Sequence, residues 1–193
     1  METWLKVFPV PKESPSQYVR SLHIWTGGTS CTPEKFPEYA SWFPNTEKIR
    51  LKGYGKTPPL PLSSPLRLSQ LDISAGSTGG ITLVQVRDVM ARLPNLDNVL
   101  LSGCFVATDS RELLGIGTVL RGRFGGTLRL CGEYADEDVI NMLLEIPSGL
   151  HFTEVQIHCM NERPPSTVRL IEACGETLVK LSHTVDMDGK PRS

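Results

Sequence analysis

Apolar residues separated by a single position recur along the chain at intervals of 22 to 29 residues. The first members of the seven pairs, which we call the anchors, are Leu22, Ile49, Leu71, Val99, Leu128, Val155 and Leu181. The seventh pair is the weakest, because its second position is His183. Apolar side chains two residues apart point to one face of an extended strand. Because the connections are too long for hairpins, the pattern predicts seven short parallel strands.

The segments between these strands carry apolar residues at helical spacing. Such faces occur within residues 36–43, 86–93 and 139–144, and a shorter one ends at 171–174. Acidic residues within 135–139 stand at a helix start, where the helix dipole favours them. Each unit is therefore expected to contain a strand, a loop, a helix and a second loop. Stacked units give a parallel sheet with helices on one side.

This unit resembles the leucine-rich repeat, whose consensus is Leu-xx-Leu-x-Leu-xx-Asn/Cys. The chain resembles more closely the divergent arrays of fungal, especially mushroom-type, F-box/leucine-rich-repeat proteins. The resemblance covers roughly residues 17–184 and is carried by YVRSLHIW (18–25), FPNTEKIRL (43–51), LPNLDNVLL (93–101) and LIEACGETLVKL (170–181). It implies an α/β solenoid of six to seven irregular repeats, with parallel strands on the concave side and helices on the convex side.

The chain departs from this family in three respects. Only Cys104 keeps the Asn/Cys position of the repeat, and residues 115–126 are rich in glycine where a helix is expected. An F-box would be a helical module of roughly fifty residues before the repeats, and none is recognisable. We expect an N-terminal cap segment (1–16), a repeat domain (17–184) and a C-terminal tail (185–193).

The outward residues of the strands are the surface that such an array offers to a partner. Solenoid proteins bind on their concave face, and Trp and Arg are enriched where binding energy concentrates. The predicted partner-binding residues are Trp25, Lys48, Arg50, Lys52, Asp72, Leu100, Arg129, Glu154 and His158. The alternative is a solvated polar sheet face that binds nothing.

The best candidates for a nucleophilic or metal-binding cluster are Cys131, His158 and Cys159. Strand alternation turns His158 outward and Cys159 inward, whereas Cys131 and His158 could be neighbours on adjacent strands. No carboxylate converges on them, because Glu154 lies roughly 13 Å away along its strand. The glycines of 115–122 do not match a dinucleotide-binding loop. We therefore predict no catalytic residue, no metal site and no cofactor.

Composition gives only limited information about the partners and the cellular compartment of the protein. The formal charge of −1 gives no reason to expect a nucleic-acid or membrane partner. The five cysteines form no CxxC motif, which favours a reducing compartment over a disulfide framework. No run of eighteen apolar residues and no signal peptide is recognisable. We expect a soluble intracellular protein, either cytoplasmic or nuclear.

These features together predict a non-catalytic protein-recognition module. The resemblance implies that such a module presents substrates to a Skp–cullin–F-box ubiquitin ligase, and this chain would supply the recognition half. Two alternatives stay open: a structural or vestigial repeat protein without a specific ligand, and a small α/β enzyme. The C-terminal edge of the sheet could self-associate, because an uncovered edge invites pairing.

Overall fold

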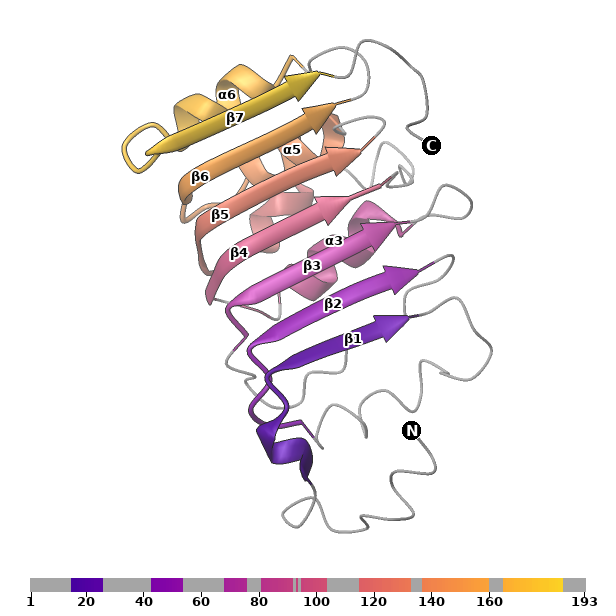
Figure 1. The fold of residues 1–193 in the computed structure, drawn as a ribbon. Coiled ribbons are helices and arrows are strands. Elements are labelled where there is room, and N and C mark those ends of the chain that lie inside the picture. Colours follow the sequence, from indigo (N-terminus) through magenta and orange to yellow (C-terminus); the bar gives the residue numbers. More distant parts are fainter. Residues whose placement is uncertain are drawn as a thin grey trace.

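The seven strands predicted from the apolar pattern are present and form one parallel sheet. In the computed structural model the described residues are 15–25, 43–53, 68–75, 81–91, 93, 95–103, 115–132, 137–159 and 165–185. The strands are β1 (Ser21–Trp25), β2 (Lys48–Gly53), β3 (Gln70–Ala75), β4 (Asn95–Ser102), β5 (Arg123–Gly132), β6 (Leu150–Cys159) and β7 (Lys180–Val185). They lie side by side in chain order, so each connection moves the chain one strand further across the sheet (Figure 1).

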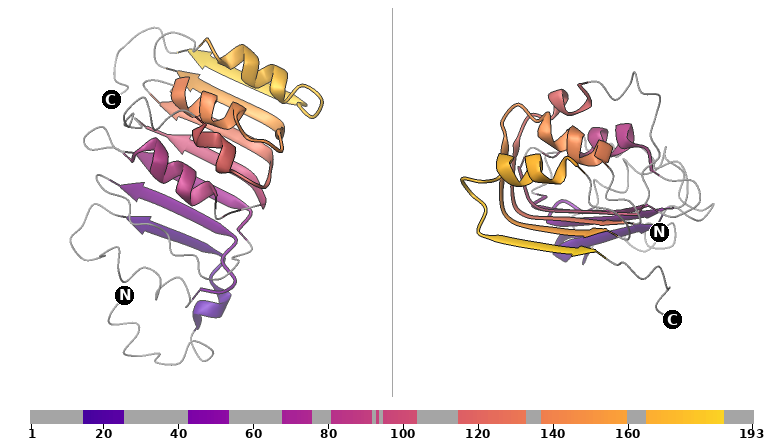
Figure 2. Two further views of the ribbon diagram at one scale, coloured as in Figure 1. Left: turned by 180° about the vertical axis from the view of Figure 1, so that it is seen from behind. Right: turned by 90° about the horizontal axis from the view of Figure 1, so that it is seen from above.

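Three α-helices cover one face of this sheet, as both views in Figure 2 show. The helical elements are α3 (Leu83–Met90), α5 (Glu137–Leu144), α6 (Thr167–Ala173) and the short 3-10 turns η2 (Pro15–Tyr18) and η3 (Ile116–Val119). A helix is present at three of the predicted places, but the predicted face at 86–93 extends too far, because α3 ends at Met90 and leaves Leu93 outside the helix. None of the three α-helices lies on the opposite face of the sheet, which we call the open face.

The anchor residues of the seven strands pair with one another in a single row. The row runs through Leu22, Ile49, Leu71, Val99, Leu128, Val155 and Leu181. The five central anchors are at most 1% exposed, whereas Leu22 is half-buried and Leu181 is 45% exposed. The difference arises because the two edge strands have a paired strand on one side only, within the described residues.

The core lies between the helix-covered face of the sheet and the helices. Val86 and Met90 of α3 and Ile140 and Leu143 of α5 are fully buried in one cluster with the strand side chains. Burying a side chain of this size stabilises a fold by about 1.5–3 kcal/mol. The apolar faces of the helices and the anchor row therefore pack together in one core.

The glycine-rich residues 115–126 form the short turn η3 and the beginning of β5 in place of a regular helix. Gly117 lies so close to α5 that a Cβ atom there would be 2.0 Å from the carbonyl oxygen of Met142. The carboxylate of Glu145 accepts hydrogen bonds from the N–H groups of Gly115 (3.3 Å) and Gly117 (2.9 Å). Here glycine allows a close approach between neighbouring units.

A second glycine, Gly126, stands at an irregularity in the sheet. The register between β4 and β5 shifts after Leu96, and the register between β5 and β6 shifts after Gly126. Gly126 has a φ of 65°, and a Cβ atom there would be 1.8 Å from the carbonyl oxygen of Asp97. The irregularity lets Phe124 pair with Leu96 and become fully buried.

Several predicted features lie outside the described residues. The helical pattern at 36–43 is one of them, apart from Phe43, and so is Cys104. The predicted cap segment (1–16) and tail (185–193) lie almost entirely outside as well.

Substitution of Gly126 by alanine should destabilise the fold more than the same change at Gly149. Both glycines have positive φ values, 65° and 73°, so both substitutions carry a backbone cost of about 1–2 kcal/mol. Only at Gly126 does the new methyl group also meet a backbone carbonyl, which adds roughly 1–3 kcal/mol. Urea unfolding of the two variants measures the difference, and equal losses of unfolding free energy would contradict the role given to this site.

Candidate functional site

The outward residues of the strands form three rows across the open face. The first row contains Ser21, Lys48, Gln70, Asn98, Thr127, Glu154 and Lys180. The second contains His23, Arg50, Asp72, Leu100, Arg129, Gln156 and Ser182. The third contains Trp25, Lys52, Ser74, Ser102, Cys131, His158 and Thr184. All nine predicted partner-binding residues therefore occupy positions in these rows.

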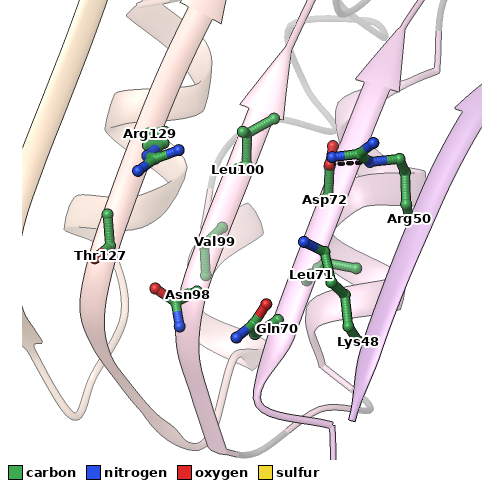
Figure 3. A pocket seen from close by; sticks show the side chains of 10 residues that line it. All are labelled: Lys48, Arg50, Gln70, Leu71, Asp72, Asn98, Val99, Leu100, Thr127 and Arg129. Carbon is green, nitrogen blue, oxygen red and sulfur yellow. Dashed lines mark hydrogen bonds and ion pairs between the residues drawn. The ribbon is translucent and has the colours of Figure 1, made fainter. Parts of the chain in front are cut away.

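A shallow cavity of about 220 Å³ opens over β2, β3, β4 and β5, and we call it the hollow. Its lining residues are Lys48, Arg50, Gln70, Leu71, Asp72, Asn98, Val99, Leu100, Thr127 and Arg129 (Figure 3). Five of the nine predicted residues are among them. Of the other four, Lys52 lies further along β2, Glu154 and His158 lie on β6, and Trp25 ends β1. The side chain of Trp25 lies outside the described residues.

Asp72 lies on the open face, as alternation predicts, but its side chain is only 7% exposed. The Nε atom of Arg50 donates a short hydrogen bond to its Oδ2 atom (Figure 3). The hydroxyl of Ser74 donates to its other oxygen at 3.5 Å and lies 2.8 Å from the hydroxyl of Ser102. A buried carboxylate needs such partners, so Asp72 serves to hold Arg50 in place rather than to meet a ligand directly.

Three other cations of this surface have no such partner in the described part of the chain, whereas Lys180 on β7 is paired with Glu154. Within the described residues, the side chains of Lys48, Lys52 and Arg129 make no hydrogen bond or ion pair. The hollow is lined by three cations and one carboxylate, which gives it a formal charge of 3 − 1 = +2. The charges of Lys48, Lys52 and Arg129 are therefore available to an anionic ligand.

Three neutral polar side chains in the hollow also lack partners among the described residues. They are the amides of Gln70 and Asn98 and the hydroxyl of Thr127, which are neighbours in the first row. Each of these groups can both donate and accept a hydrogen bond. The predicted set omits all three, although their place one residue before each anchor is readable from the sequence.

Glu154 on β6 is engaged with its neighbours. Its Oε1 atom accepts hydrogen bonds from Lys180 Nζ at 2.6 Å and from Gln156 Nε2 at 2.5 Å. These two bonds, the one from Lys180 first, lower the pKa of the Glu154 carboxyl below its usual range. The pair links β6 to the edge strand β7.

Of the two cysteine candidates, Cys131 shows no sign of activation as a nucleophile, and the side chain of Cys159 lies outside the described residues. Cys131 pairs in register with His158, as the alternation argument allows. Burial raises the pKa of the Cys131 thiol, and the charge of Arg129 only partly opposes this. Burial raises the pKa of Cys174 further, to about 11. Both thiols are thus predominantly protonated at neutral pH, whereas the nucleophilic and metal-binding form is the thiolate.

Within the described ranges, no group of three or more His, Cys, Asp or Glu side chains is arranged to hold a metal ion. No described helix combines the length and the apolar character that crossing a membrane requires. Comparison of the chain with protein-family models, with curated proteins and with solved structures found no match. The chemistry of the open face is therefore the observation on which a function can rest.

Replacing Arg50 by methionine should destabilise the fold by about 1–3 kcal/mol, because the substitution leaves the buried Asp72 carboxylate without its cation. The double variant Arg50→Met/Asp72→Leu should recover most of this loss, because the uncompensated charge is then gone. Lys52→Met is the matched control, since Lys52 has no partner among the described residues. Unfolding in urea measures all three variants, and a double variant less stable than Arg50→Met would refute this role of the pair.

Replacing Lys180 by methionine should raise the pKa of Glu154 towards its ordinary value, because the hydrogen bond from Lys180 is the largest cause of the lowering. Arg129→Met should raise it less, since Arg129 is the smallest contributor. A ¹³C NMR titration of the carboxyl group measures both shifts, and the reverse order would contradict the assignment. Because the folded pKa is lowered, Glu154 stabilises the fold above its unfolded pKa, and this contribution is lost as the pH falls through the folded pKa.

Proposed function

We propose that this chain is a non-catalytic recognition module that binds an extended segment of a partner protein across the open face. The observation that carries the proposal is a row of three polar groups in the hollow, those of Gln70, Asn98 and Thr127, which make no side-chain hydrogen bond to any described residue. Side-chain amides offer the same donors and acceptors as a peptide backbone and can pair with it in either direction. The half-buried side chain of Leu100 adds an apolar contact beside them.

The same proposal includes a leucine-rich-repeat-like solenoid over residues 17–184, with the open face as its concave side. One strand per unit, strict chain order and helices on one face support this architecture. As the resemblance to fungal F-box/leucine-rich-repeat proteins implies, the partner is then a substrate, and the chain supplies the substrate-binding part of a ubiquitin ligase subunit.

Binding, rather than nucleophilic chemistry, fits the character of the described side chains. The thiol of Cys131 is held in its protonated form by burial. The polar groups of the hollow lie in rows across four strands and do not converge on one point. Rows of this kind match an elongated ligand.

Selection from a library of random twelve-residue peptides displayed on phage tests the proposal. The wild-type chain should enrich a common set of peptides. The variant Gln70→Ala/Asn98→Ala should bind these peptides about tenfold more weakly by fluorescence anisotropy, because two hydrogen-bonding amides are lost. The control Arg169→Ala/Glu172→Ala changes two exposed residues of α6 and should bind them as the wild type does. Failure to enrich any peptide, or equal binding by all three proteins, would overturn the proposal.

A further inference from the structure

The unpaired cations of the hollow lie on two different strands, and the lining residues on the strands between them are neutral apart from Asp72, whose carboxylate is bound to Arg50. Lys48 is on β2 and Arg129 is on β5, and Gln70, Asn98 and Leu100 occupy the strands between. Three strand spacings and an offset of two residues separate the Cα atoms of the two cations by about 16 Å. Figure 3 shows their side chains on the two sides of the hollow.

Arg50, the third cation of the hollow, contributes less positive charge for a ligand. The Nε atom of Arg50 is bound to the buried carboxylate of Asp72, which offsets its charge. Lys48 and Arg129 make no hydrogen bond or ion pair within the described residues, although the charge of Arg129 also acts on the Glu154 carboxyl of the neighbouring strand. The positive charge available to a ligand is therefore divided between the two ends of the hollow.

From this arrangement, and resting on the proposed function, we infer that the hollow is specific for an acidic peptide segment that crosses the strands from β2 to β5. One anionic side chain of the segment pairs with Lys48 and a second pairs with Arg129. In an extended segment, residues four positions apart point to the same side and lie about 13 Å from each other. The long side chains of lysine and arginine span the remaining distance, so a pair of acids at positions i and i+4 fits best.

The side chains between the two cations favour a peptide over a nucleic acid. Proteins that bind single-stranded nucleic acid stack the bases on aromatic side chains. The side chains that line the hollow include none, whereas the amides of Gln70 and Asn98 suit a peptide backbone. The anionic groups of the segment are carboxylates or phosphorylated hydroxyls, which share the chemistry that Lys and Arg recognise.

Charge reversal tests the inference directly. The probe is the fluorescein-labelled peptide GSEGSGEGS, and its analogues carry glutamine, lysine or phosphoserine in place of both glutamates. The wild-type chain should bind the glutamate peptide about tenfold more tightly than the glutamine peptide, and added salt should reduce this preference. The variant Lys48→Glu/Arg129→Glu should instead prefer the lysine peptide.

Matched controls separate the site from the overall charge of the protein. Arg121→Glu/Arg169→Glu changes the net charge equally at exposed residues outside the three rows, and it should keep the preference for glutamate. Lys48→Gln/Arg129→Gln should lose the preference for either charge, and thermal unfolding followed by circular dichroism verifies that each variant is folded. Tighter binding of the phosphoserine peptide than of the glutamate peptide would identify a phosphorylated segment as the source of the charge, and the reverse would identify acidic residues.

Three results would overturn the inference. They are equal binding of the glutamate and glutamine peptides, an unchanged preference in the charge-reversed variant, and displacement of the probe by oligothymidylate at lower concentrations than by unlabelled glutamate peptide. The last result would show that the hollow binds single-stranded nucleic acid.

If the phage selection enriches peptides without acidic residues, the proposed function stands and only the acidic specificity is wrong. If the phage selection enriches no peptide, both the proposed function and the acidic specificity are wrong.

Discussion

In-register pairing of the seven parallel strands is the constraint on which the rest of this structure depends. Each strand is hydrogen-bonded to the one before it in the chain, and each anchor is paired with the next. Because side chains alternate along a strand, this register turns every anchor toward the helices and every intervening residue toward the open face. A shift of one residue in any strand would exchange the two sets, so the core and the candidate site are fixed by the same pairing.

The pairing also explains where the structure is irregular. Gly126 and Gly117 each stand where backbone from two neighbouring units comes closer than a side chain would permit. The first absorbs a change of register and the second brings η3 against α5. At the far edge, Leu181 is 45% exposed and Val179 is 86% exposed, because no further strand follows β7 within the described residues.

Some side chains of the open face are bound to one another, whereas others remain available to a ligand. The buried carboxylate of Asp72 holds Arg50 in place, and Glu154 bonds to Lys180 across the last pair of strands. By contrast, the amides of the first row and the cations Lys48 and Arg129 make no hydrogen bond or ion pair with other described side chains, so they can bind a ligand. Such a division is suited to binding, because the groups that position the surface are distinct from those that would contact a partner.

The sequence by itself determined the strands, three of the helices, the anchor row and the side to which each strand residue turns, because these follow from the periodicity of apolar residues. It did not determine that Asp72 is buried, that Lys48 and Arg129 lie at two ends of one hollow without a bonded partner in the described part of the chain, or that Gln70 and Asn98 line this hollow. These features depend on which side chains of neighbouring strands meet, at sequence separations of 22 residues or more, as for Arg50 and Asp72. Only the tertiary structure brings such residues together, since local pattern carries no information about the rotamers and burial of partners on another strand.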